Sequence, residues 1–350
     1  MVGLDTMTDP TTRRQSRRVT IDRIAREAGV SLTTVSRALN NRPDIHPETR
    51  ARILAIAQEL GYTPSAIARG LATQRTHTIG LAVRTHLDAW AAQILLPIEE
   101  TARDLGYEVF VSMHHAEAER EHSVLRAFYS RHVEGMIVVS SVLGEDIPAL
   151  QESTGIPIVL ISPLVQASHR YTVQTNDFGG ARSATEYLIH LGHRRIAHIS
   201  APEWTTPGRD RLRGYRAALE AHGIPWNPEL VFEGDAHETG GSEGVQALLT
   251  LANAPTALLC FNDLTAVGVF HGARMKGVRI PADLSVAGFD DVPMAQYLDP
   301  PLTTCHQDME ALGGQAIRML LDLIAGRNTQ APIVLDTVLV KRLSCAPRAA

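Results

Sequence analysis

The spacing of apolar residues changes near position 77. In residues 19–62, apolar positions recur three or four apart, as in Ile21, Ile24, Ala25 and Ala28, which is the repeat of an amphipathic helix. From Thr78 onward, short continuous β-branched runs alternate with amphipathic segments. The first pattern predicts a small helical head, and the second predicts an α/β body.

Capping residues divide the head into three helices. Thr20 suits the N-cap of the first helix, and Gly29 suits its left-handed end. Ser31 suits the N-cap of a second helix, and Pro47 suits the first position of a third, which ends at Gly61. Two short helices joined by a tight turn and followed by a third form the layout of a helix-turn-helix unit.

The polar face of the second predicted helix indicates DNA binding. Arg37 has the fork geometry for guanine, and the methyl groups of Leu32 and Thr33 suit thymine methyls. Hydroxyls nearby suit hydrogen bonds to phosphates, at Thr20, Thr34 and Ser36. An ordinary three-helix bundle with an incidental arginine is the alternative.

In the body, a series of short strands is predicted, with helices between them. The strand segments are TIGLAV, YEVFVSM, GMIVVS, IPIVLIS, RIAHIS, LVFEG, TALLCF and LSVAGF, with further strands near 333–341. Helices are expected over 90–105, 119–131, 146–153, 178–191, 209–222, 240–251, 263–276 and 308–325. The rhythm restarts after Asp177, so we predict two doubly wound parallel-sheet lobes with a ligand cleft between them.

Charge separates the head from the body. Residues 1–75 hold twelve Arg and seven Asp or Glu, a balance of +5, whereas the remainder carries −10 of the total of −5. A basic head indicates a polyanion partner, although a solvated basic face gives the same count.

Composition narrows the class of protein. The 350 residues are 44% hydrophobic and 20% charged, as in a globular protein with a sizeable core. Three scattered cysteines without CxxC spacing indicate a reducing compartment. There is no signal-peptide pattern and no apolar run of about 18 residues, so a soluble, cytoplasmic, nucleoid-associated protein is expected.

Enzyme and cofactor motifs find little support. The sequence has no phosphate-binding loop after a strand and no GxSxG elbow, so neither an enzyme nor a cofactor is expected. His114, His115 and His122 form a conceivable metal cluster, but no fourth ligand is nearby and no metal site is predicted.

The sequence of the head resembles that of a known protein family. The segment VTIDRIAREAGVSLTTVSRALNNRPDIHPETRARILAIAQELGY closely resembles the N-terminal signature of the lactose repressor (LacI/GalR) family of bacterial transcription regulators, and the likeness extends to about Leu343. It implies that Leu32, Thr33 and Arg37 read bases. It also implies contacts to the DNA backbone from Thr20, Ser36, Asn40, Thr49 and Tyr62.

The resemblance divides the chain further. It implies a tail over 1–18, a DNA-binding domain over 19–64, a hinge over 65–76, and a body over 77–343 with a short tail after it. In the body, lobe 1 would hold 77–175 and 307–343, and lobe 2 would hold 176–306. In the hinge, Leu71, flanked by Ala68, would wedge into the minor groove. Ser65 and Gly70 depart from the family pattern, and a plain linker is the alternative.

The resemblance also implies an effector site. Arg211, Asn262 and Asp290 match effector-contacting positions, and Trp90 replaces a phenylalanine that is common in the family. An arginine, a carboxylate and an aromatic ring suit a sugar or sugar derivative; Trp204 is a second ring that suits stacking. Ser162 and Ala236 depart from the pattern, which keeps a purine or another metabolite open as the ligand.

The expected function is therefore that of an effector-controlled repressor. A homodimer would bind a pseudopalindromic double-stranded operator, and a small molecule in the periplasmic-binding-protein-like body would set its affinity. A solute-binding protein and an enzyme on the same bilobed frame are the alternatives. The first would lack the head, and the second lacks a recognisable nucleophile.

Overall fold

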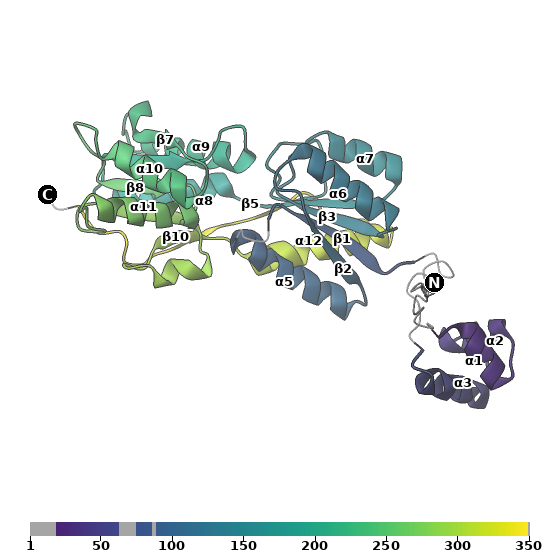
Figure 1. Ribbon diagram of the computed structural model, residues 1–350. Coiled ribbons are helices and arrows are strands. Elements are labelled where there is room, and N and C mark those ends of the chain that lie inside the picture. Colours follow the sequence, from purple (N-terminus) through teal and green to yellow (C-terminus); the bar gives the residue numbers. More distant parts are fainter. Residues whose placement is uncertain (1–18, 63–74, 86–88, 349–350) are drawn as a thin grey trace, which may run out of the picture. The chain divides into compact units, whose positions relative to one another are not determined.

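The computed structural model describes residues 19–62, 75–85 and 89–348, which form two compact units divided between Thr76 and His77 (Figure 1). The first unit is the helical head and the second is the α/β body. No helix in the described part of the chain is long and apolar enough to span a membrane.

The head consists of α1 (Ile21–Ala28), α2 (Leu32–Leu39) and α3 (Pro47–Glu59), as predicted. Gly29 ends α1 with φ 63°, and the Ser31 hydroxyl accepts a hydrogen bond from the Thr34 amide as the cap of α2. Thr20 occupies the N-cap position of α1, but its side chain does not cap the helix. The core of the head is closed by side chains from all three helices: Ile24, Ala25, Ala28, Val35, Ala38, Ile53 and Ala57.

The first lobe of the body is built on a six-stranded parallel sheet with the order β11-β5-β4-β3-β1-β2. Its strands are β1 (Thr78–Val83), β2 (Glu108–Met113), β3 (Gly135–Val139), β4 (Ile158–Ile161), β5 (Thr172–Thr175) and β11 (Ile333–Leu335). The helices that cover it are α5 (Ala89–Asp104), α6 (Ala118–Ser130), α7 (Asp146–Thr154) and α12 (Met309–Ile324).

The second lobe repeats this plan with the strand order β12-β10-β9-β8-β6-β7. Its strands are β6 (Ile196–Ser200), β7 (Val231–Glu233), β8 (Ala257–Cys260), β9 (Ser285–Asp290), β10 (Thr303–His306) and β12 (Val338–Val340), of which β12 alone is antiparallel to its neighbour. Four α-helices pack on its two faces: α8 (Asp177–His190), α9 (Thr206–Ala221), α10 (Glu238–Leu248) and α11 (Asp263–Met275).

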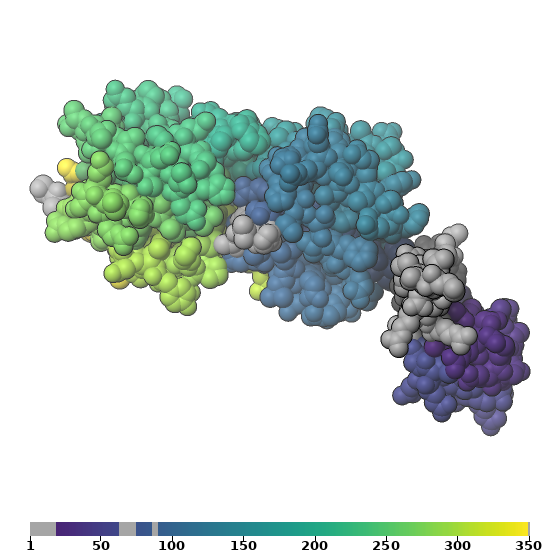
Figure 2. All heavy atoms as spheres, in the orientation of Figure 1, coloured from purple at the N-terminus to yellow at the C-terminus, as the bar shows by residue number. Residues whose placement is uncertain are grey.

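The chain passes between the lobes three times, after β5, after β10 and after β11, and the lobes lie side by side (Figures 1 and 2). The prediction that the strands near 333–341 complete the first lobe is wrong for β12, which pairs with β10 of the second sheet. Lobe 1 therefore ends near Leu335 rather than at Leu343. The reason is that Asp336 and Thr337 carry the chain back across the junction, and a three-residue strand gives no periodicity from which to choose a sheet.

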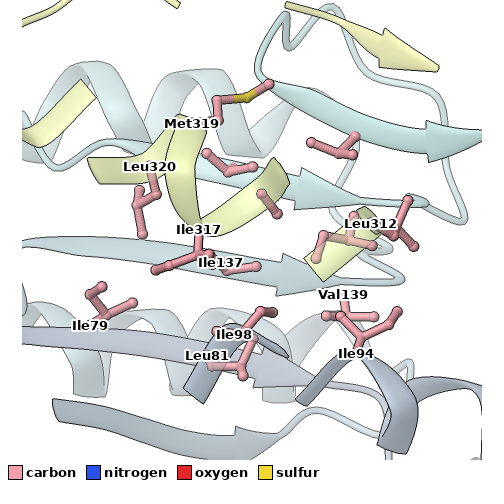
Figure 3. Packing of buried hydrophobic residues seen from close by; sticks show 14 of the residues in the cluster. Ile79, Leu81, Ile94, Ile98, Ile137, Val139, Leu312, Ile317, Met319 and Leu320 are labelled. Atoms are coloured by element: carbon pink, nitrogen blue, oxygen red, sulfur yellow. The ribbon is translucent and has the colours of Figure 1, made fainter. Parts of the chain in front are cut away.

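A buried cluster shows how the first lobe is held together. Ile317 and Leu320 of α12 and Ile94 of α5 lie against the strand residues Ile79 and Ile137, and all five are fully buried (Figure 3). Burial of such side chains is worth about 1.5–3 kcal/mol each. The late helix α12 therefore supplies a large part of the core of a lobe whose sheet begins at residue 78.

Candidate functional site

A cavity of about 180 Å³ lies where the carboxyl ends of strands from both lobes meet. Its lining includes all four residues that the family resemblance implies for the effector: Trp90, Arg211, Asn262 and Asp290. Polar and aromatic neighbours also line it, among them Asp177, Phe261 and Gln307. Mostly apolar pockets with a few convergent polar groups are typical small-molecule sites.

Arg211 is the central charge of this cavity. It lies on α9, is buried, and donates from Nε to Asp177 at 2.8 Å and from Nη1 to the carbonyl of Phe261 at 2.6 Å. Its Nη1 is 3.5 Å from the Asp290 carboxylate, and its guanidinium lies 3.7 Å from the Phe289 ring centre. Burial raises the pKa of Asp177, and the adjacent guanidinium opposes that rise. The cation is therefore fixed in position by carboxylates and aromatic faces.

Asp290 ends β9 and is held in an unusual backbone conformation, with φ 112°. Its Oδ1 accepts a hydrogen bond of 2.6 Å from Nε2 of Gln307, whose Oε1 accepts one of 2.7 Å from the Thr175 hydroxyl. Strained backbone of this kind persists where the surrounding contacts over-determine it, and it is common at ligand sites. The contacts here connect the cavity to two of the chain crossings.

Asn262 lies at the N-cap of α11. Its Oδ1 accepts from the amide and hydroxyl of Thr265, both at 2.8 Å, and its Nδ2 donates to the carbonyl of Ala236 at 3.0 Å. The side chain thus fixes the start of α11 and the loop at Ala236 together, while its amide lines the cavity. Ala236, where the family often has an aromatic residue, lines the cavity without a ring.

Two predicted aromatic residues also line the cavity. Trp90, on α5, is partly buried, and Trp204, from the second lobe just before α9, has 58% of its surface exposed. Ser162, also in the lining, has a positive φ of 42°, and its buried hydroxyl has no hydrogen-bond partner within the described residues. A hydroxyl in this state is available to a ligand.

Three residues of the site, Asp177, Gln307 and Phe261, were not predicted from the sequence. Asp177 and Gln307 follow the short strands β5 and β10, which the apolar pattern does not predict because threonine fills half of their positions. Phe261 reads as the end of a buried strand. Because neither strand is recognised in the sequence, Asp177 and Gln307 cannot be identified as polar residues near a strand end.

The predicted DNA-reading side chains share one exposed surface of the head. Leu32, 46% exposed, and Thr33 lie in the first turn of α2, and Arg37 lies one turn further along. They line a shallow hollow with neighbouring residues: Ile21, Ser36, Asn40, Arg42 and Asp44. The arginine is not free in this surface, because its Nη1 donates to Asp44 at 2.7 Å.

Of the predicted backbone-contacting residues, Ser36 and Asn40 line this hollow, and the others lie at the start of α1 and on or just after α3. Thr20 and Asn40 are exposed and Ser36 is partly buried; Asn40 Nδ2 donates to the Ser36 carbonyl at 2.9 Å. Thr49 lies in the first turn of α3 and Tyr62 just after its end, packed against the core of the head. Ala68 and Leu71 of the predicted hinge lie outside the described residues, so their role stays a prediction.

Two of the three histidines considered for a metal, His114 and His122, have separate partners. His114 is buried, its Nε2 is 3.0 Å from the Val139 carbonyl, and its Nδ1 lies 3.7 Å from Glu121. His122 pairs with Asp146 instead. These two side chains therefore link neighbouring elements, His114 to the end of β3 and His122 to the start of α7.

Two family profiles match the chain. Residues 20–65 match "Bacterial regulatory proteins, lacI family", and residues 185–345 match "Periplasmic binding protein-like domain". These ranges correspond to the head with the start of the predicted hinge, and to most of the second lobe with α12 and the C-terminal strands.

Curated proteins and solved structures agree with these matches. The chain is 31% identical to the HTH-type transcriptional repressor PurR of Aliivibrio salmonicida over 90% of its length and 95% of the relative, and 34% identical to the PurR of Haemophilus influenzae over 88% and 92%. A lac repressor dimer bound to operator and the anti-inducer ONPF superposes with a TM-score of 0.86 at 30% identity, covering 94% of this chain and all of that one. A CelR–cellobiose complex gives 0.70 at 31% identity, covering 93% and 100%.

The PurR and lac proteins are repressors rather than enzymes, and the likeness extends through both the head and the body. The predicted fold is confirmed, and the chain is not an enzyme. The chain belongs to the lacI family of bacterial regulatory proteins and is a transcriptional repressor.

Proposed function

We propose that this repressor binds a pseudopalindromic operator as a homodimer and that a polyhydroxylated small molecule, a sugar or sugar derivative, controls its affinity from the cleft between the lobes. The observation that carries the effector proposal is the buried Arg211, held between Asp177 and Asp290 in a cavity that both lobes line. A ligand that bridges such a cavity interacts differently with the open and closed arrangements of the lobes, which is what allosteric control requires.

The operator-binding part rests on α2. Its exposed face presents Leu32, Thr33 and Arg37 together, and the methyl groups of the first two beside a guanidinium fit the edges of T·A and G·C pairs in the major groove. The head carries a positive balance over residues 1–75, which favours the phosphate backbone. Such a repressor acts where its operator lies, on the nucleoid in the cytoplasm.

Exposed apolar side chains support the homodimer. Phe110 and Val111 lie on β2, the edge strand of the first sheet, at 45% and 51% exposure, and Leu96 on α5 is 59% exposed. In the second lobe, Met294 and Tyr297 are exposed in the short 3₁₀ helix Pro293–Tyr297. Apolar residues along an edge strand favour a partner surface, and a second copy meets the twofold symmetry of the operator.

The chemistry of the cavity favours a polyol. The Asp290 carboxylate accepts hydrogen bonds and the Arg211 guanidinium donates them, so adjacent sugar hydroxyls find both kinds of partner. Trp90 and Trp204 add apolar faces for a sugar ring, and the Ser162 hydroxyl adds a further group. All of these groups belong to the described lining of one cavity.

A purine is the second candidate. Several of the most similar curated repressors carry the name PurR, and the Phe261 ring lies in the cavity wall beside Arg211, with the guanidinium 4.4 Å from the ring centre. A flat heterocycle stacks on such rings, and Asn262 and Asp290 are suited to its polar edge.

Two experiments test the proposal. In the first, random duplexes are selected for binding to the full chain at about 150 mM salt, alone and with sugar or purine mixtures. A recovered palindrome supports the operator-binding part, and no sequence preference under any condition contradicts it.

In the second, sugars and purines are titrated calorimetrically into wild type, Asp290→Asn and the control Glu220→Gln, which neutralises an exposed carboxylate in the same lobe. Binding of a sugar that Asp290→Asn alone weakens supports the proposal. Binding of purines only replaces the sugar by the second candidate.

A further inference from the structure

The carboxylate nearest the base-reading arginine is unusual for a DNA-binding surface. Asp44 Oδ2 accepts a hydrogen bond of 2.7 Å from Nη1 of Arg37, and both residues line the hollow formed with Leu32, Thr33 and Ser36. A carboxylate repels the phosphates of any duplex that approaches. Its position next to the reading group therefore lowers affinity for all DNA sequences unless it has another effect.

Stability of the head does not account for the pair. The Arg37 and Asp44 side chains are 56% and 49% exposed, and ion pairs at such exposure contribute little to folding. The residues are seven positions apart and do not form a pair within one helix.

The loop that carries Asp44 is anchored on both sides. The Arg42 amide donates to the Arg37 carbonyl at 3.0 Å, and the Arg50 guanidinium of α3 binds the Arg42 carbonyl. Next to Asp44 in sequence, Ile45 packs against the core of the head. These anchors fix the loop around Asp44, and so they fix the position of its carboxylate beside the guanidinium of Arg37.

The Asp44 carboxylate limits the conformations that the flexible Arg37 side chain can adopt. An arginine side chain loses much rotamer freedom when it binds a base, and less is lost if one edge of the guanidinium is already held. Only one hydrogen bond joins the pair, so the other donors of the planar guanidinium stay available for the two acceptors of guanine.

We infer that Asp44 is a positioning residue which holds Arg37 in its reading orientation and so sets operator discrimination at the base pair that Arg37 contacts. The inference rests on the proposed base reading by Arg37. It differs from that proposal in assigning specificity to a residue whose charge opposes DNA binding. Asp44 acts through Arg37 and contacts no base.

The test uses the full chain and the operator recovered by selection. Wild type, Asp44→Asn, Asp44→Ala and Arg37→Ala are titrated against the operator, against operators substituted at each single base pair, and against a non-specific duplex of equal length. Asp22→Asn is the matched control, because it removes one negative charge from another exposed arginine–aspartate pair of the head, with Arg26. Thermal melting of each variant reports on folding.

The three variants that remove a negative charge, Asp44→Asn, Asp44→Ala and Asp22→Asn, are expected to bind the non-specific duplex slightly more tightly. Only the Asp44 variants are expected to lose discrimination, by about fivefold or more at the single base pair where Arg37→Ala also loses it. In the double variant Arg37→Ala with Asp44→Ala, the loss at that base pair should not exceed that of Arg37→Ala alone, because the two residues act as one unit.

Other outcomes overturn the inference. If the Asp44 variants bind operator and substituted operators more tightly by the same factor, Asp44 merely competes with DNA for Arg37. If they change preference at a different base pair, Asp44 reads a base itself. If Arg37→Ala keeps full discrimination, the proposed base reading fails, and this result is distinguishable because it does not involve Asp44.

Discussion

Gln307 donates a hydrogen bond of 2.6 Å to Asp290, which joins the segment between the lobes to the end of a strand in the cavity. The same side chain accepts a hydrogen bond from the hydroxyl of Thr175, which lies at the start of another of the three crossings. Gln307 is buried and lines the cavity. A ligand that binds Asp290 therefore acts on the Gln307 side chain, which connects two of the segments that link the lobes.

Replacing Gln307 by leucine should weaken both ligand binding and its effect on DNA. The change leaves a buried hydroxyl and a buried carboxylate without this partner, which costs about 1–3 kcal/mol for each such group. We expect a lower free energy of unfolding in urea and a smaller ratio of operator affinities with and without ligand. The control is Gln330→Leu, at an exposed position between α12 and β11. An unchanged affinity ratio would show that Gln307 does not take part in the coupling.

Arg211→Ala should destabilise the second lobe as well as abolish effector binding. It leaves Asp177, whose pKa burial already raises, without its guanidinium partner. Removing one member of a buried ion pair costs about 3–5 kcal/mol. Urea unfolding at pH 7 measures this cost, and a loss below about 1 kcal/mol would mean that water or a rearranged chain replaces the cation.

His198 should make the second lobe sensitive to acid. Burial lowers the pKa of this histidine from 6.5 to about 4, while its Nδ1 hydrogen-bonds the Leu259 carbonyl at 2.9 Å. Below pH 6.5 the unfolded chain binds a proton here and the folded chain does not, so the free energy of unfolding falls as the pH drops from 6.5 to 4. The total loss is about 3 kcal/mol, at 1.36 kcal/mol per pH unit.

The variant His198→Asn isolates this effect, because its amide nitrogen can replace Nδ1 as the donor while asparagine does not titrate. Asp263 has the opposite dependence, since burial raises its pKa to about 7, but it is present in both proteins and cancels in the difference. Urea unfolding at several pH values between 7 and 4 gives that difference. A gap between wild type and variant that stays constant with pH would refute the assignment.

The variant Gly268→Ala should push α11 away from α10 and lower the stability of the second lobe. A Cβ atom at this position would lie 1.9 Å from the carbonyl oxygen of Glu238, and backbone cannot move aside as a side chain does. We expect a loss of about 1–3 kcal/mol of stability. Gly314→Ala in α12 is the control, because only the flexible guanidinium of Arg318 is near and alanine favours a helix; it should be neutral or stabilising by about 0.5–1 kcal/mol. Equal effects in the two variants would contradict the proposed clash.

The head can be predicted well from the sequence because its information is local. Gly29, Ser31 and Pro47 act within one turn of chain, and each has the predicted position in its helix. The strands of the body are also predicted where β-branched residues run continuously. The short strands β5 and β10 are missed because their burial depends on neighbours far away in the sequence.

The cavity shows the limit of the same reasoning. The residues implied by the family resemblance do line it. However, Gln307 is hydrogen-bonded to Thr175, which lies 132 positions earlier in the sequence, and no rule of sequence spacing predicts such a pair. The Arg37–Asp44 pair is missed for a different reason. The loop between them has no periodicity, and its path is decided by the anchors from Arg50 and Ile45.

The three crossings between the lobes also have a consequence for biosynthesis. When the ribosome has made everything up to Leu302, the first lobe still lacks α12 and β11, and the second still lacks β10 and β12. Neither lobe can close its core as a finished folding unit before the last stretch of the polypeptide is translated. A premature stop codon in that region would therefore leave two incomplete lobes rather than one intact lobe and one damaged one.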